Sequence, residues 1–156
     1  MPSPSPTAPV ATSGPVLDQL NVVVSDMDAA VAFYRLLGVV IADTHPDWMA
    51  HHRNATSSPG SVALDLDSSS FAARWSSGWP VGRTGVTVGF RVGSRADVDS
   101  LHAAIVAAGY RSQQSPYDAF WGARYAVVED PAGTAVGLMS ARDPAFVGPP
   151  PDPSSF

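Results

Sequence analysis

The chain has 156 residues, of which 45% are hydrophobic and 15% charged, and its formal net charge is −5. This length suits one domain with a hydrophobic core rather than two, and no uncharged apolar run reaches the ~18 residues of a membrane span. A phosphate backbone would be repelled by the negative charge, and the sequence contains no basic patch that would reverse the field. We therefore expect neither nucleic acid nor a membrane as a partner.

The absence of two residue types narrows the available chemistry. There is no Lys and no Cys, all basic side chains other than His are Arg, and Glu129 is the only Glu. Schiff-base chemistry, a P-loop lysine, thiol nucleophiles, zinc fingers and disulfide scaffolds are thereby excluded. The high Ala, Pro and Arg content without Lys is typical of a GC-rich bacterial genome.

Both ends of the chain are rich in Pro. Residues 1–15 contain five Pro and mostly small residues, which predicts a disordered tail. This segment lacks the basic start and apolar run of a secretory signal, so we expect a cytoplasmic protein. Residues 143–156 read as a second Pro-rich tail, in which Phe146 and Val147 could fold back onto the domain, and this leaves 16–142 as the folded domain.

The first half of this domain, 16–67, predicts a strand, a helix and three further strands. Residues 17–24 form the first strand, and Ser25 and Asp28 stand at capping spacing before a helix that Gly38 ends. Three short strand candidates follow, separated by Pro and Gly, at 39–44, 48–54 and 61–67.

The second half, 85–142, repeats this plan after a linker at 68–84. A strand at 85–92 precedes a helix that is capped by Ser94 and Asp97 and ended by Gly109. Further strands are expected at 110–114, 121–129 and 134–140, the last two joined by a turn at 130–133. The sequence thus predicts an α+β fold in which two tandem βαβββ modules form one eight-stranded curved sheet around a cleft, with the helices outside.

These elements resemble the vicinal oxygen chelate superfamily, which includes glyoxalase I, extradiol dioxygenases, fosfomycin resistance enzymes and bleomycin resistance proteins. The resemblance is carried by Val23-Val24-Ser25-Asp26, by Phe33-Tyr34 with Leu37-Gly38, and by the closing Asp130-Pro131-Ala132-Gly133. Residues 121–125 are most similar to bleomycin resistance proteins, in which a Trp-Gly pair, an Arg and an aromatic residue precede this turn. The resemblance implies a glyoxalase-like homodimer whose partner helps to close each cleft.

The superfamily's enzymes hold a divalent metal, and the resemblance places their ligands at Gln19, Thr87 and Gly137, with Asp65 at a fourth position. Gln19 and Asp65 offer oxygen donors, but Thr87 is a poor ligand and Gly137 has no side chain. Because a bound metal normally has three or more protein ligands, we expect no metal and no other cofactor. Adjacent His51 and His52 point to opposite faces of a strand, so both cannot hold one ion.

The hairpin at 130–133 decides which side chains line the cleft. A simple turn would set Arg124 opposite Met139 and point both into the cleft, where Arg124 would bind an anionic group or stack on a ring. The alternative for Arg124 is a salt bridge to Asp65 or Asp118. Aromatic residues in segments that border the cleft offer stacking surfaces, or else belong to the core or a dimer interface. They are Trp48, Phe71, Trp75, Trp79, Tyr117, Phe120 and Trp121. The predicted ligand-binding residues are Gln19, Trp48, His52, Asp65, Trp79, Arg91, Tyr117, Trp121, Arg124 and Met139.

Three functions fit these observations. The first is a metal-free bleomycin resistance type protein that binds and sequesters a natural-product or antibiotic-like small molecule without turning it over. The negative net charge favours a cationic ligand, whereas Arg124 and Arg91 favour an acidic or aromatic one. The second is a superfamily enzyme, of the lyase, isomerase or dioxygenase class, that acts through an atypical metal site or none, with Gln19, Asp65, His52 and Arg124 as its polar set. The third is a small interaction domain with a vestigial cleft.

Overall fold

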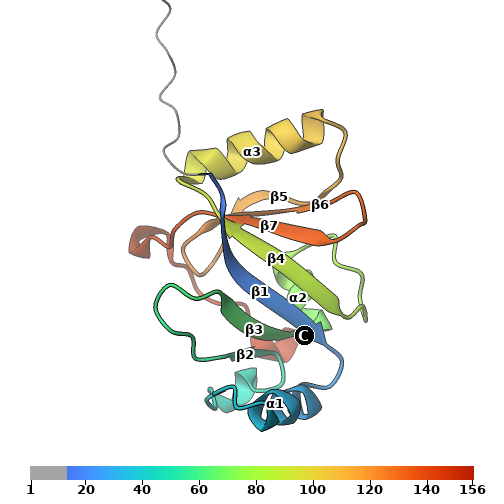
Figure 1. Ribbon diagram of the computed structural model, residues 1–156, viewed down its shortest axis with the longest axis vertical. Helices are drawn as coiled ribbons and strands as arrows, with labels where there is room; N and C mark the ends of the chain where they lie inside the picture. Colours follow the sequence, from blue (N-terminus) through green and yellow to red (C-terminus); the bar gives the residue numbers. More distant parts are fainter. Residues whose placement is uncertain (1–13) are drawn as a thin grey trace, which may run out of the picture.

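A computed structural model describes residues 14–156, so the predicted tail at 1–15 lies outside it except for its last two residues. Seven strands form a single curved, open, mixed sheet (Figure 1). In sheet order they are β2 (His52–Asn54), β3 (Ala63–Ser68), β1 (Val16–Val24), β4 (Gly85–Arg91), β7 (Ala135–Met139), β6 (Arg124–Glu129) and β5 (Ser112–Asp118).

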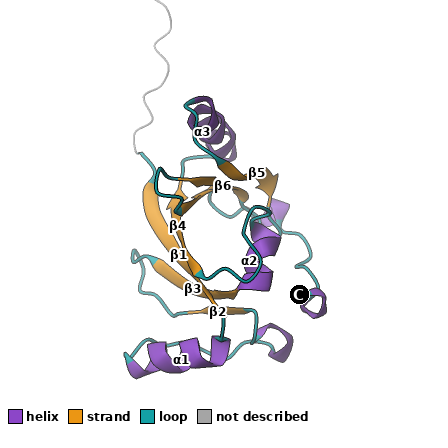
Figure 2. Cartoon of the chain, turned by 90° about the vertical axis from the view of Figure 1, so that its right-hand side faces the viewer, coloured by secondary structure: helices purple, strands orange, loops and turns teal. Residues whose placement is uncertain are grey.

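The centre of the sheet is the antiparallel pair of β1 and β4, with Leu20 opposite Val88. β3 runs parallel to β1 on one side, and β7 runs parallel to β4 on the other. Three α-helices accompany the sheet, α1 (Met27–Leu36), α2 (Ser69–Trp75) and α3 (Arg95–Ala107). Figure 2 shows the sheet curving around an interior, with α2 across this interior from β1 and β4.

The helix ends follow the predicted capping chemistry closely. Ser94 caps α3 as expected, accepting a hydrogen bond from the amide of Asp97 at 3.1 Å. At α1 the cap is Asp26 rather than Ser25, and it accepts from the amide of Ala29. Both glycines predicted to end helices, Gly38 and Gly109, have positive φ, which a residue without a side chain adopts at little cost.

The predicted eighth strand at 39–44 does not form. The segment makes one isolated bridge, between Ile41 and Ala55. Two of its carbonyl groups bind side chains: Arg35 donates to the carbonyl of Ile41, and Arg53 donates to that of Ala42 at 2.9 Å. The carbonyl of Val40 accepts from the amide of Thr56 at 2.8 Å. The described chain therefore has seven strands, and its first half does not reproduce the predicted βαβββ plan strand for strand.

The register of the β6–β7 hairpin differs by one residue from the prediction. A loop of three residues, 131–133, joins the strands, with Gly133 at φ +82° and the Asp130 carboxylate accepting from the amides of Ala132 and Thr134. Met139 is consequently opposite Tyr125 rather than Arg124. Because a one-residue shift moves every side chain to the other face, Tyr125 and Val127 lie on the concave side, and the prediction that Arg124 faces the cleft was wrong.

Two segments expected to be irregular carry structure. The linker at 68–84 contains α2, and residues 143–156 fold back onto the domain instead of extending from it. Val147 bridges to Trp121, and the ring of Phe156 packs against Trp48 and Phe71 at centroid distances of 5.7 and 5.6 Å. This C-terminal segment closes one side of the concave interior.

The outer face of the central strands is apolar and uncovered. Figure 1 shows α3 at one end of this face and α1 at the other, with the β1–β4 pair bare between them. Side chains alternate along a strand, so the residues between the inward ones face outward. We call the outward set the outer strip; it comprises Leu20, Val22, Leu64, Val86, Val88 and Phe90, which are half-buried except for exposed Val86.

The helices of residues 14–156 are all too short or too polar to cross a membrane.

Candidate functional site

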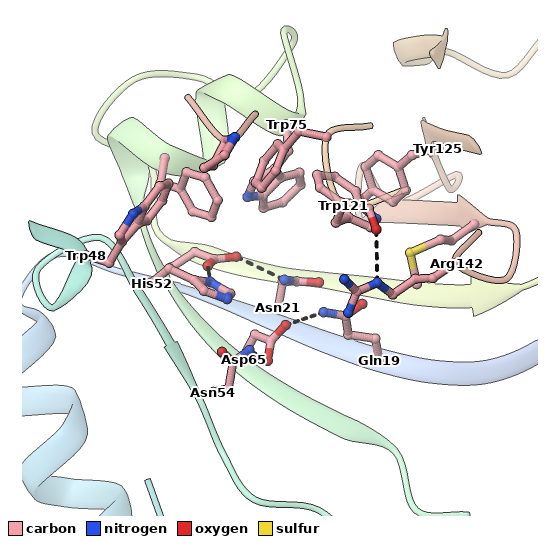
Figure 3. A pocket seen from close by; sticks show the side chains of 15 residues that line it. Gln19, Asn21, Trp48, His52, Asn54, Asp65, Trp75, Trp121, Tyr125 and Arg142 are labelled. Carbon is pink, nitrogen blue, oxygen red and sulfur yellow. Dashed lines mark hydrogen bonds and ion pairs between the residues drawn. The ribbon is translucent and has the colours of Figure 1, made fainter. Parts of the chain in front are cut away.

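A cavity of about 390 Å³ occupies the concave side of the sheet. The strands β1, β2 and β3 supply one wall, and β6, β7, α2 and the C-terminal segment supply the other (Figure 3). The first wall carries polar side chains and the second carries mostly rings. The lining residues are Gln19, Asn21, Trp48, His52, Asn54, Asp65, Asp67, Phe71, Trp75, Phe120, Trp121, Tyr125, Met139, Arg142 and Pro150.

Strand register builds the polar wall. Asp65 lies between Asn21 on β1 and Asn54 on β2, and Asp67 lies opposite His52. Each is two residues from the next inward position of its own strand, so their side chains project to the same face. The polar wall is therefore a consequence of the alternation in these three strands. Their outward residues form half of the outer strip and also pack under α1.

His52 and Asp67 form a close buried pair. The ring nitrogen Nδ1 of His52 lies 2.6 Å from Oδ1 of Asp67, whose side chain is fully buried. The second oxygen of Asp67 accepts from Nδ2 of Asn21 at 2.9 Å. Burial disfavours the charged imidazole, but the hydrogen bond and charge of Asp67, together with the charge of Asp65, outweigh burial and raise the pKa of His52.

Asp65 is held by two amides. Nδ2 of Asn54 donates to Oδ1 at 2.6 Å, and Nε2 of Gln19 donates to Oδ2. Burial and the charge of Asp67 together raise the pKa of Asp65 by more than His52 and the two amide hydrogen bonds lower it. Two carboxylates thus share one wall, and their four oxygens are met by three neutral amides and one imidazole.

Rings form the opposite wall. Trp121 and Tyr125 meet edge to face with centroids 5.4 Å apart, and Trp48 and Phe71 do so at 5.3 Å. The ring of Phe71 also lies 5.4 Å from that of His52, which joins the two walls at the α2 end. Trp75 from α2 contributes a buried indole whose Nε1 has no partner among the described residues. The cavity therefore offers a flat apolar surface opposite a hydrogen-bonding one.

The residues at the positions where the resemblance implies metal ligands do not fit a divalent cation. The amide of Gln19 is engaged with Asp65, Thr87 lies buried beneath the wall, and Gly137 has no donor. A side chain at Gly137 would begin 2.9 Å from the hydroxyl of Tyr125, so Tyr125 already fills that place. Burial raises the pKa of Tyr125, which keeps its phenol neutral. Residues 14–156 contain no cluster of three His, Cys, Asp or Glu that would hold a metal.

Six of the ten predicted ligand-binding residues meet in this cavity. The alternation of the strands was sufficient to place the inward positions on β1, β2 and β3, and the position of Met139 followed from its phase with Gly137. The six are Gln19, Trp48, His52, Asp65, Trp121 and Met139.

The structure places the other four outside the cavity. Arg124 pairs with Asp99 of α3 at 2.8 Å and with Asp118 at 3.1 Å, the second of which is one of the alternatives that the sequence left open. Arg91 is half-exposed at the end of β4, 3.5 Å from Asp18. Trp79 is buried in the core, and its indole donates to the carbonyl of Arg83. Tyr117 is largely buried and donates to the carbonyl of Trp75.

Several lining residues were absent from the predicted set. Asn21, Asn54 and Asp67 follow from the rule of alternation, since each is two positions from a residue already assigned inward. Phe71 and Trp75, which the sequence placed among the aromatic residues bordering the cleft, come from α2, a helix that the sequence did not predict. The others depend on the hairpin register or on the fold of the C-terminal segment; they are Phe120, Tyr125, Arg142 and Pro150.

Comparison with known proteins agrees with this architecture. A sequence model described as the Glyoxalase/Bleomycin resistance protein/Dioxygenase superfamily matches residues 16–138. No curated protein matches the sequence.

Solved structures with a similar fold include enzymes of different chemistry. A Mn(II)-bound glyoxalase from Novosphingobium aromaticivorans is 19% identical with a TM-score of 0.57, over 80% of this chain and 38% of that one. Methylmalonyl-CoA epimerase from Streptomyces coelicolor, solved with 2-nitronate-propionyl-CoA, is 25% identical with a TM-score of 0.52, over 81% and 97%. A methylmalonyl-CoA epimerase solved with methylmalonyl-CoA and NH4+ is 26% identical with a TM-score of 0.53, over 88% and 100%.

The His52–Asp67 pair makes a pH-dependent prediction. In an NMR titration the ring of His52 should have a pKa above its unfolded value of about 6.5. Its protonated form then stabilises the fold below pH ~6.5, and this contribution is lost as the pH rises through the folded-state pKa. Asp67→Asn removes the charge that contributes most to raising the pKa of His52, so this pKa should fall.

His102 on α3 provides the internal control for this titration. Burial lowers its pKa, and it lies outside the cavity, so Asp67→Asn should leave its titration unchanged if the variant is folded. A wild-type His52 whose pKa is at or below its unfolded value would contradict the assigned pair. A pKa that does not change in Asp67→Asn would also contradict it.

Proposed function

Because this chain belongs to the Glyoxalase/Bleomycin resistance protein/Dioxygenase superfamily, we propose that it binds and sequesters a small, partly aromatic molecule without a metal, as bleomycin resistance type proteins do. Structurally similar superfamily proteins bind small molecules, methylmalonyl-CoA among them. The observation that carries the proposal is the cavity of about 390 Å³, in which a wall of rings faces a wall of amides and carboxylates. Its size and composition suit an organic ligand.

The replacement of the metal position by Tyr125 supports a binding role. The phenol stands where an acidic ligand residue on β7 would begin, and Gly137 leaves room for it. Its ring extends the apolar wall formed by Trp121 and Met139. A flat ligand would gain stacking contacts there, and the bound amides of Gln19 and Asn54 would hold their geometry during binding because they are already fixed by Asp65.

A superfamily enzyme is the second candidate function, and one observation favours it. The His52–Asp67 pair has the arrangement of a general base with an orienting carboxylate, because Asp67 holds Nδ1 of His52 at 2.6 Å. In this case the ligand would be a substrate that His52 deprotonates or protonates. Retention of an unaltered ligand distinguishes sequestration from such catalysis.

Binding is tested by incubating the purified protein with a small-molecule extract of its source cells, then desalting it and analysing it by native and denaturing mass spectrometry. We expect one organic adduct per chain with a mass also present in the starting extract. Trp121→Ala should weaken its affinity by about 1–2 kcal/mol, roughly tenfold, through lost stacking.

The exposed residue Val81 supplies the matched control, and Val81→Ala should leave the affinity unchanged. No retained molecule from an extract that contains the ligand class would overturn sequestration. Conversion of the molecule into one of different mass or configuration, with loss of turnover in His52→Gln, would support the enzyme.

We also propose that the protein is a homodimer, with a second copy covering the outer strip rather than closing the cleft as the resemblance implies. No charged or polar side chain interrupts these six residues, so they offer nothing to anionic lipids or to nucleic acid. The antiparallel pairing about Leu20 and Val88 gives the strip an approximate twofold symmetry, which suits packing against an identical face. A cytoplasmic location and a bacterial source, expected from the sequence, stay predictions.

Val88→Arg tests the dimer. Because this side chain points outward, the charge would be buried in the dimer and solvated in the monomer, so light scattering after size exclusion should show a shift from dimer to monomer. Val81→Arg adds the same charge outside the strip and should leave the dimer intact. A monomeric wild type, or a dimeric Val88→Arg variant with native circular dichroism, would contradict the proposed interface.

A further inference from the structure

The charge of the cavity is concentrated on its polar wall. Asp65 is 8% exposed and Asp67 fully buried, and their side chains come from adjacent inward positions of β3. Burying a carboxylate is costly unless a cation or several hydrogen bonds compensate. Three of their four bonded partners are neutral amides, and His52 is the single group among the partners that carries a positive charge when protonated.

The arginines near the cavity do not neutralise these carboxylates. Arg142 lines the mouth, where its side chain is exposed and its Nε donates to the carbonyl of Trp121 at 2.9 Å. Water screens a cation in that position. Arg53 follows His52 on β2 and faces the other way, toward Asp43 at 2.8 Å. Within residues 14–156, the ion pairs of Asp65 and Asp67 are limited to the one with His52.

The two arginines predicted to bind an anionic ligand, Arg124 and Arg91, lie outside the cavity. They pair there with Asp99, Asp118 and Asp18. An anion that reached the polar wall would meet two carboxylates in a partly desolvated environment, where like charges repel strongly. A cation in the same place would be attracted by both carboxylates.

The aromatic wall adds a second attraction for positive charge. Ring faces carry negative electrostatic potential and bind ammonium and guanidinium groups, most strongly from Trp. Trp48, Trp75 and Trp121 all line the cavity, as does Tyr125. Figure 3 shows these rings on the side of the cavity across from Asp65, Asn21 and Gln19. A nitrogen cation between the two walls would contact both.

We propose that the ligand is a cationic aromatic molecule, with an ammonium, amidinium or guanidinium group beside the carboxylate of Asp65, in the field of the buried Asp67, and with its ring system against Trp121 and Tyr125. This inference rests on the proposed binding function and specifies the chemical class of its ligand. It also assigns the two walls separate roles, with the carboxylates selecting charge and the rings providing apolar contact.

Three probes with the same ring test the charge selection. Naphthylmethylammonium, naphthylmethanol and naphthoate differ in a single group that is cationic, neutral and anionic, and their binding is followed by ligand-observed NMR and calorimetry at pH 7 and low salt. We expect naphthylmethylammonium to bind at least tenfold more tightly than naphthylmethanol, and naphthoate to bind most weakly. Asp65→Asn should remove about tenfold of the cation's affinity and leave that of naphthylmethanol unchanged.

Asp28→Asn is the matched control, because it makes the same change of net charge at an exposed position in the first turn of α1. It should leave all three affinities unchanged. If Asp65→Asn does not fold, raising the salt concentration with the wild-type protein gives the second readout. Salt should lower the affinity of the cationic probe and leave that of the neutral probe unchanged. Equal affinities, or a preference for naphthoate, would overturn the cationic ligand and leave the binding function standing. Failure of all three probes to bind would overturn both.

Discussion

The two faces of the central strands have opposite character, and both the cavity and the bare outer face depend on this. On β1 the inward residues Gln19 and Asn21 alternate with the outward Leu20 and Val22, and β4 pairs with β1 so that the outward residues of both strands share one face. A sheet with one solvated face normally places polar residues outside and apolar residues inside. Here the polar side chains face the concave interior, where they are useful only to something bound there, and the apolar ones face outward, where they require a cover.

The concave interior is divided between the two halves of the sheet. Strands β2, β3 and β1 contribute amides, carboxylates and an imidazole, whereas β6 and β7 contribute Tyr125 and Met139. The division matters because a ligand between the walls meets hydrogen-bonding and charged groups on one side and rings on the other. The arginines of α3 and β6 do not enter either wall. They pair with Asp99 and Asp118 on the outside of the second half.

The sequence predicted the parts of this arrangement that depend on local pattern. Alternation placed Gln19, His52 and Asp65 inward, and glycine at the ends of two helices was confirmed by positive φ at Gly38 and Gly109. The predicted hairpin register was wrong because loops of three and four residues both suit the sequence at 130–133. The backbone geometry of Gly133 and the hydrogen bonds of Asp130 select the loop of three residues. Tyr125 therefore could not be assigned to the cavity, and Arg124 was assigned to it in error.

Two further differences arise from long-range contacts that periodicity does not encode. The segment 39–44 has the composition of a strand, but Arg35 and Arg53 bind its carbonyl groups and prevent a ladder. The Pro-rich segment 143–156 has the composition of a tail, but the packing of Phe156 against Trp48 and Phe71 holds its end to the domain. In each case a few side chains from distant positions override the local preference.

We propose that side chains alone bind an organic ligand in the place where the resemblance implies a metal. It is tested most directly by native mass spectrometry of the untagged protein, prepared without chelator and then titrated with Mn(II) and Zn(II). We expect a chain mass with no stoichiometric divalent ion at any step of the titration. One divalent ion per chain, lost in Gln19→Ala or Asp65→Asn, would contradict it and would make the second candidate function, an enzyme with an atypical metal site, the better description.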